Sequence, residues 1–261
     1  MMIPIKRGED IKHMREACIV AATVLDRMAA LVEPGCNTYD IDQAGKKFMD
    51  ELGAVSACYN YRGGGPVPYP AYTCLSINDE IVHGIGSITR SLREGDIITL
   101  DVAIIYNGWI GDNARTIAVG KVAPEVEFLL KSTEEAFHKG MQQARKGKRV
   151  GDISFAVQRS LDAHNLGIVR DFVGHGVGRS MHEEPQIPNF GRKNTGPRLA
   201  AGMTLCIEPM VTLGSPEVKM LSDGWTASTR DGSWSAHYEH TVLITPEGPE
   251  ILTIPESQLK K

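Results

Sequence analysis

A short pattern occurs twice in this 261-residue chain and constrains the fold more than any other sequence feature. In residues 94–101 and again in residues 201–208, a glycine is followed six residues later by a carboxylate at the end of an apolar strand. In each half a second carboxylate then opens another apolar segment, Asp112 in the first half and Glu239 in the second. One such pair of matching segments could arise by chance. We favour an internal duplication whose two halves meet face to face.

The spacing of apolar residues predicts the main elements of both halves. Helices are expected over residues 9–31, 38–52, 125–146 and 151–164, with Thr38 as the N-cap of the second helix. Strands are expected over residues 74–77, 97–106 and 109–119. The last two strands flank Asn107-Gly108, which is a strong hairpin signal.

Helices therefore occur in two pairs, each followed by strands that pair antiparallel. This order predicts an α+β fold, with helices packed on one face of a curved, mainly antiparallel sheet. We expect a single catalytic domain over residues 1–261, with pseudo-symmetric halves at about 8–120 and 121–250.

Composition narrows the function classes. The chain is 42% hydrophobic and 23% charged, as soluble globular proteins are, and its net charge of -4 argues against a general affinity for nucleic acid. The basic run at residues 145–149 is interpreted as a solvated helix end. Five scattered cysteines without a CxxC pair indicate a reducing cytoplasm. There is no apolar stretch long enough to span a bilayer and no signal-peptide pattern, so we expect no membrane association.

Four acids in the repeated units suggest a metal centre: Asp101, Asp112, Glu208 and Glu239. Taken singly, each is more often a strand-end cap, a turn residue or an ion-pair partner. Packed side by side, four carboxylates would repel one another and raise one another's pKa values. Two divalent cations would balance that charge. Asp101 and Asp112 are expected as cross-strand neighbours, about 4.5–5.5 Å apart at Cβ, which suits two ions about 3.5–4 Å apart.

An imidazole ligand is expected from His175, which has glycines on both sides in residues 172–178. The alternative is an ordinary glycine-rich turn with a surface histidine. A site of mixed oxygen and nitrogen ligands favours manganese, iron, cobalt or zinc over calcium.

Residues 172–182 read FVGHGVGRSMH, and together with the four acids they resemble methionine aminopeptidases of type I. The resemblance covers nearly the whole chain and implies the pita-bread fold of two pseudo-symmetric halves. It implies a dinuclear metallo-exopeptidase, a hydrolase that removes the initiator methionine from nascent proteins and prefers a small second residue.

The resemblance also assigns roles to residues. Asp112 and Glu239 would bridge two divalent ions (Co, Mn, Fe or Zn), Asp101 would chelate one ion, and His175 and Glu208 would complete the other. Glu208 would also relay a proton from the attacking water. His83 would contact the scissile amide, and His182 would polarise its carbonyl. The substrate pocket would comprise Cys58, Tyr61, Tyr69, Cys74, His83, Met181, His182 and Trp225, and a monovalent cation would lie at Asn78 and Ser235.

Two departures from the family pattern concern the pocket. Met181 stands where an aromatic residue is usual, and residues 64–68 resemble an insertion beside Tyr61 and Tyr69. The segment between His175 and Glu208 is too short for the helical insertion of type II enzymes, and no zinc-finger extension precedes the first helix, which implies a bacterial or organellar type. We expect a cytoplasmic monomer that meets nascent N-termini near the ribosome and binds no specific nucleic acid.

Two other functions share some of these features. A related metallopeptidase for Xaa-Pro bonds shares the metal ligands but usually has an additional N-terminal domain, for which 261 residues leave no room. A pita-bread binding protein without catalysis typically lacks metal ligands, whereas all five are present here.

Overall fold

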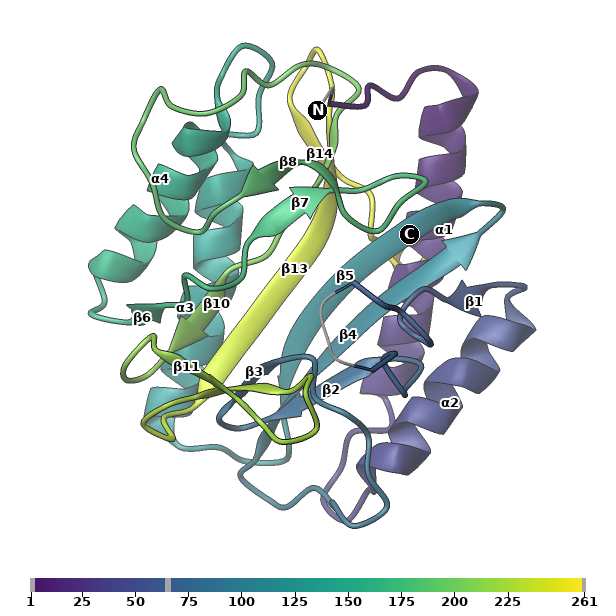
Figure 1. Cartoon of the computed structure of the whole chain (residues 1–261), viewed down its shortest axis with the longest axis vertical. Coiled ribbons are helices and arrows are strands. Elements are labelled where there is room, and N and C mark those ends of the chain that lie inside the picture. The colour runs from purple at the N-terminus through teal and green to yellow at the C-terminus, as the bar shows by residue number, and fades with distance from the viewer. Residues whose placement is uncertain (1–2, 64–66, 260–261) are drawn as a thin grey trace.

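The computed structural model describes residues 3–63 and 67–259, and in it helices lie behind a broad sheet (Figure 1). The helices are α1 (Glu9–Ala29), α2 (Thr38–Glu51), α3 (Pro124–Met141), α4 (Val150–Asp162) and α5 (Glu256–Leu259). The strands of the first half are β1 (Val55–Ser56), β2 (Cys74–Ile77), β3 (Glu80–Val82), β4 (Ile97–Tyr106) and β5 (Trp109–Ala118). Those that follow are β6 (Gly167–Ile168), β7 (Gly174–Gly176), β8 (Glu183–Ile187), β9 (Thr204–Ile207), β10 (Met210–Thr212), β11 (Val218–Met220), β12 (Ala227–Thr229), β13 (Ser235–Ile244) and β14 (Pro249–Ile251).

The main sheet brings strands from distant parts of the chain together. Its principal order is β1-β4-β5-β13-β9-β7-β8, and β2, β6, β10 and β14 pair alongside this path. A smaller sheet has the order β11-β12-β3. The predicted hairpin between β4 and β5 is present, and Asn107 and Gly108 both have positive φ, at 50° and 76°. Positive φ at both central residues is what the tight two-residue hairpin turn requires.

Most helix boundaries lie within two residues of the expectations, and two differences, at α2 and α3, affect the interpretation. The N-cap of α2 is Asn37 rather than Thr38, because the Asn37 side chain accepts a hydrogen bond from the amide of Tyr39 at 2.8 Å. Thr38 is buried, and its hydroxyl contacts the Ser87 backbone instead. Helix α3 ends at Met141, not at residue 146, so the basic run lies in the loop before α4.

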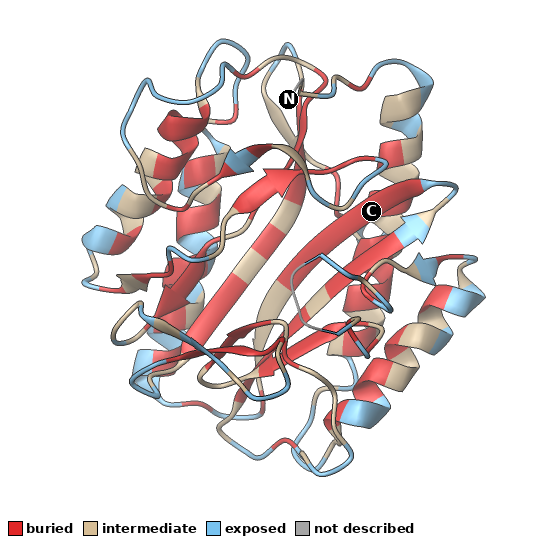
Figure 2. Cartoon of the chain, viewed as in Figure 1, coloured by how far each residue is buried: buried red, intermediate tan, exposed pale blue. Residues whose placement is uncertain are grey.

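Apolar helix faces pack against the sheet. Helix α1 covers β4 and β5, and α3 covers β13. The contact between α1 and β5 is close because Gly111 has no side chain: a Cβ there would overlap the Ala17 carbonyl oxygen. Figure 2 shows that the central strands are largely buried and that the outer helix faces are exposed. This packing leaves the opposite face of β4, β5 and β13 free to carry other side chains. Within residues 3–63 and 67–259, every helix is too short or too polar to span a lipid bilayer.

Candidate metal centre and substrate pocket

The acids of β4, β5 and β13 lie on one face of the sheet. Ala114 pairs with Asp101 on one side and with Glu239 on the other, so these residues form one row across three strands. Asp112 lies two residues before Ala114 and shares its face, because side chains alternate along a strand. Asp112 itself pairs with Ala103. Asp101 and Asp112 are therefore diagonal neighbours, for which a separation of about 7–8 Å is usual, and not the directly opposed pair that was expected.

The second half supplies the other candidate ligands. His175 on β7 pairs with Cys206 on β9, and Glu208 comes directly after the end of β9. The Nε2 atom of His175 lies 3.4 Å from Oε1 of Glu208 and 3.8 Å from Oδ2 of Asp112. All five residues that were predicted as ligands thus line one cavity.

The charge state of this cluster is unfavourable without cations. Burial raises the pKa of Asp101 to about 7, and burial together with neighbouring acids raises the pKa values of Asp112, Glu208 and Glu239 well above their usual range. Burial also lowers the pKa of His175 to about 3, which keeps its ring neutral. Histidine binds a divalent cation through a neutral ring, and a cluster of carboxylates supplies the negative charge that attracts the cation.

Unpartnered atoms support the same conclusion. Oε1 of Glu208 and Oε1 of Glu239 are buried and have no hydrogen-bond partner among the described residues. An orphaned buried carboxylate oxygen is costly unless a cation or a donor satisfies it. The residues present therefore fit a divalent metal centre.

Two further side chains face the cluster and were missed from the sequence. The Sγ atom of Cys206 groups with ligand atoms of Asp112, His175 and Glu239, all within 4.8 Å of one another. His237 is buried, its Nε2 atom lies 3.9 Å from Oε2 of Glu208, and neither ring nitrogen has a hydrogen-bond partner among the described residues. Period-two spacing could have identified both, because His237 stands two residues before Glu239 and Cys206 two residues before Glu208.

The cavity extends from the acids into an apolar recess. Its volume is about 330 Å³, and every residue predicted for the substrate pocket lines it: Cys58, Tyr61, Tyr69, Cys74, His83, Met181, His182 and Trp225. The Tyr69 and Trp225 rings meet edge to face at 5.3 Å. The Tyr69 hydroxyl donates to the Gly84 carbonyl at 2.8 Å, and the Trp225 indole donates to the Val67 carbonyl at 2.9 Å. These bonds fix two aromatic walls. Residues 64–66 of the apparent insertion lie outside the described part of the chain.

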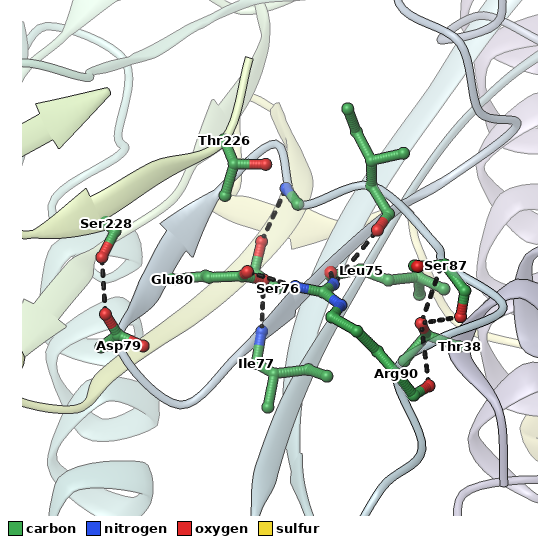
Figure 3. A network of polar contacts seen from close by, with 12 residues as sticks. Thr38, Leu75, Ser76, Ile77, Asp79, Glu80, Ser87, Arg90, Thr226 and Ser228 are labelled. Atoms are coloured by element: carbon green, nitrogen blue, oxygen red, sulfur yellow. Dashed lines mark hydrogen bonds and ion pairs between the residues drawn. The ribbon is translucent and has the colours of Figure 1, made fainter. Parts of the chain in front are cut away.

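A polar network holds the segment that carries His83 (Figure 3). The Glu80 carboxylate accepts hydrogen bonds from the Ile77 amide and from Arg90, and Arg90 also donates to the Leu75 carbonyl at 3.2 Å. Gly84, the residue after His83, packs closely against Leu75 of β2. A Cβ at Gly84 would overlap the Leu75 carbonyl oxygen. Although it is not a glycine, His83 has φ +61°. The surroundings thus impose an uncommon backbone conformation that directs the ring into the cavity.

The two predicted catalytic histidines differ in their surroundings. Burial lowers the pKa of His83 to about 4, so the ring is neutral at pH 7. His182 lies at the exposed rim, and its Nδ1 atom is 2.6 Å from the Tyr61 hydroxyl. The ring of His182 also meets that of His175 edge to face at 4.5 Å. His182 therefore borders both the candidate metal ligands and the apolar recess.

Asn78 and Ser235 are adjacent to each other but are not among the residues that line this cavity. The Ser235 amide donates to the Asn78 carbonyl at 2.8 Å. The Asn78 side chain already bonds the Ile97 amide and Asp96. The Ser235 hydroxyl is buried and has no partner among the described residues.

The comparison with known proteins agrees with this geometry. The model of metallopeptidase family M24 matches residues 12–246, so the chain belongs to that family. A methionine aminopeptidase of Clostridium acetobutylicum is 45% identical over 255 residues, covering 98% of this chain and 100% of that protein. The crystal structure of methionine aminopeptidase from Rickettsia prowazekii matches with a TM-score of 0.93 at 39% identity, covering 97% and 100% of the two chains. Within family M24, the chain belongs with the methionine aminopeptidases, and the predicted pita-bread fold is confirmed.

A more distant likeness concerns the fold alone. A prolidase from Pyrococcus furiosus matches with a TM-score of 0.74 at 22% identity, covering 97% of this chain but only 66% of the prolidase. The Xaa-Pro alternative is therefore not favoured over the methionine aminopeptidases.

Proposed function

We propose that this chain removes the N-terminal methionine from nascent proteins and peptides. The observation that carries the proposal is one cavity that joins four acids and His175 to an aromatic and sulfur-containing recess. A thioether side chain is long, apolar and polarisable, and such a recess suits it. Because all five candidate ligands line the cavity, a binding protein without catalysis is not favoured.

The roles proposed for the ligands are those that the family resemblance implies, and the positions of the residues support them. Asp112 and Glu239 would bridge two divalent ions, since one lies on each of the two adjacent central strands, β5 and β13. Asp101 would complete the coordination of one ion, and His175 and Glu208 would complete that of the other. Asp101 lies on one side of the bridging pair, and His175 and Glu208 lie on the other side. Bound divalent cations would supply Lewis-acid activation of water and of the scissile carbonyl.

Three side chains would manage protons and charge during hydrolysis. Glu208 has a buried oxygen without a hydrogen-bond partner, so it can accept a proton from water and pass it to the leaving amine. His182, held near Tyr61 at the rim, would stabilise the developing negative charge on the carbonyl oxygen. His83 would contact the scissile amide from the wall of the cavity.

We propose cobalt, manganese, iron or zinc at the centre, since oxygen and imidazole ligands suit these metals. A monovalent cation is proposed beside Asn78 and Ser235, where the Ser235 hydroxyl lacks a partner among the described residues. We also propose that the protein acts as a cytoplasmic monomer near the ribosome.

Peptide hydrolysis tests the substrate class. The metal-loaded protein is assayed with Met-Ala-Ser, Ala-Ala-Ser and Met-Leu-Ser, with the Asp112→Asn variant as a control for contaminating peptidases. We expect Met-Ala-Ser to be cleaved fastest and the variant to be inactive. Cleavage of Ala-Ala-Ser as fast as Met-Ala-Ser would refute the specificity for methionine.

A further inference from the structure

Lys6 is buried beside the turn that carries His182, which comprises residues 177–182 between β7 and β8. Among the residues that the structure describes, Lys6 is the only lysine or arginine that is buried, with 4% of its surface exposed. Its Nζ atom lies 2.5 Å from Oε2 of Glu183, a side chain that is itself only 11% exposed. Burying a lysine is costly unless an acid compensates its charge, and Glu183 does so here. The pair joins the segment before α1 to the first residue of β8.

The segment before α1 is held so that the Lys6 side chain reaches the turn. The Lys6 amide donates to the Gly202 carbonyl at 2.8 Å, and Ile3 and Ile5 pack against a cluster of buried apolar residues. Gly178 leaves room for the lysine side chain, because a Cβ there would lie only 2.7 Å from Cε of Lys6. The fit of the segment against the turn therefore fixes where the ammonium group lies.

The Glu183 carboxylate connects Lys6 to the backbone of the turn. Its Oε2 atom accepts from the Lys6 ammonium group, while its Oε1 atom accepts the amides of Arg179 at 3.0 Å and of Ser180 at 3.4 Å. One oxygen is thus occupied by a cation and the other by two backbone amides. The charged hydrogen bond from Lys6 keeps the carboxylate in the orientation that serves both amides.

His182 depends on this turn for its position at the cavity. Its ring is contacted by the Tyr61 hydroxyl, 2.6 Å from Nδ1, and its backbone lies directly before Glu183. Neither Lys6 nor Glu183 is among the described residues that line the catalytic cavity. Any effect of the ion pair on hydrolysis must therefore pass through the turn and the side chains that it carries.

We propose that Lys6 is a positioning residue for His182. Its ammonium group fixes Glu183, and Glu183 in turn fixes the backbone from which His182 reaches the scissile carbonyl. Misplacing a reacting group by about 1 Å can lower a rate about a hundredfold, so a contact that fixes this backbone affects turnover. The inference rests on the role in peptide hydrolysis that is proposed above for His182.

Hydrolysis of Met-Ala-Ser by the manganese-loaded protein tests this inference with Lys6→Met, which keeps an unbranched side chain but removes its charge. Arg15→Met is the control, because it removes another ion pair between distant parts of the chain: Arg15 on α1 lies 2.7 Å from Glu250 on β14. We expect Lys6→Met to lose about tenfold or more in kcat with KM nearly unchanged, since His182 acts on charge that develops in the transition state. Arg15→Met should keep its kcat within about twofold, and an equal loss in both variants would overturn the inference.

Glu183→Gln tests the same contact from its other side and serves if Lys6→Met does not fold. Glutamine has one side-chain oxygen, which cannot serve both Lys6 and the turn amides as two carboxylate oxygens do. We expect it to lose about tenfold in kcat as well, and the double variant Lys6→Met/Glu183→Gln to lose no more than either single variant, because both changes break one contact. Losses that multiply in the double variant would show that Lys6 does not act through Glu183.

Hydrogen exchange measured by mass spectrometry separates this local role from a general loss of stability. In Lys6→Met, the amides of residues 177–182 should exchange about tenfold faster or more, while those of β4 and β5 exchange as in the wild type. Faster exchange throughout the chain, or wild-type kcat in a variant that thermal unfolding shows to be folded at the assay temperature, would overturn the inference. Exchange needs no substrate, so the two proposals fail separately: a wild-type protein that cleaves no peptide would refute the proposed function, whereas unchanged exchange at residues 177–182 would refute positioning by Lys6.

Discussion

At the level of single residues, the candidate metal centre is built from groups that are unfavourable in isolation. Asp112 and Glu239 are buried and Glu208 is half-buried beside them, and loss of solvent together with the neighbouring acids raises the pKa values of all three far above those of solvated acids. His175 is kept neutral beside them because burial lowers its pKa. Burying these groups destabilises the cation-free fold but favours the binding of cations, and strongly shifted pKa values of this kind are common at functional sites.

His83 gives a test at this scale, because it lines the cavity without belonging to the candidate ligands. We expect His83→Ala to bind manganese as the wild type does, and to lose about a hundredfold or more in kcat. Isothermal titration of the metal-free proteins with Mn²⁺, beside hydrolysis of Met-Ala-Ser, measures both quantities. Wild-type turnover in the variant would exclude the proposed contact with the scissile amide.

The sequence singled out the candidate metal ligands but not their neighbours in the cluster. Carboxylates in apolar strands are conspicuous, so Asp101 and Glu239 could be recognised without coordinates. His237 and Cys206 were not, since histidine and cysteine are ordinary residues in a buried strand. Only the pairing of β9 with β13 and β7 shows that Cys206 faces the same cluster.

At the level of elements, the two faces of the central strands serve different purposes. One face of β5 carries Asp112, while Gly111 on the other face allows α1 to approach. We propose that the repeated helix pairs and strands derive from one duplicated unit. The hairpin could be predicted because Asn107-Gly108 is a local signal, whereas the pairing of β5 with β13 joins residues remote in sequence and could not.

The close approach of α1 to β5 leads to a stability prediction. We expect Gly111→Ala to destabilise the protein by about 1–3 kcal/mol, because the added Cβ would overlap the Ala17 carbonyl oxygen. Urea denaturation measures the free energy of unfolding. Gly191→Ala is the control, since its added Cβ would come no closer than 3.1 Å to Ser154 Cβ. A Gly111→Ala variant as stable as this control would contradict the packing described for α1.

His240 on β13 gives a pH-dependent prediction. Burial and the nearby His138 lower the pKa of His240 to about 4 from an ordinary value of 6.5. Between these pH values the unfolded chain binds a proton that the folded chain does not. The contribution of His240 to stability is therefore complete above about pH 6.5 and is lost as the pH falls toward 4.

The His240→Gln variant cannot take up this proton. As the pH falls from 7 to 4, the wild type should lose up to about 3 kcal/mol more of its free energy of unfolding than the variant does. Urea denaturation of both proteins in the presence of a chelator measures this difference at each pH. A difference that does not change with pH would show that His240 titrates normally in the folded state.

At the level of the whole molecule, the site exists only where the two halves of the chain meet. Asp101 and Asp112 come from the β4–β5 hairpin, whereas His175, Glu208 and Glu239 come from the part of the chain beyond α4. Sequence spacing could suggest this arrangement, but the actual contact between halves depends on the register of β5 against β13. Similarly, the basic run at residues 145–149 could be read from the sequence, but its junction with residues 192–198 could not.

The central claim is that these five ligands hold two divalent ions that hydrolysis requires. The most direct measurement is a titration of chelator-treated, metal-free protein with Mn²⁺, with bound metal and Met-Ala-Ser cleavage recorded in the same samples. We predict no cleavage without metal, binding of up to two ions per chain, and recovery of activity as the ions bind, with no recovery in Asp112→Asn. Undiminished cleavage by the metal-free protein, or full recovery in Asp112→Asn, would contradict this account.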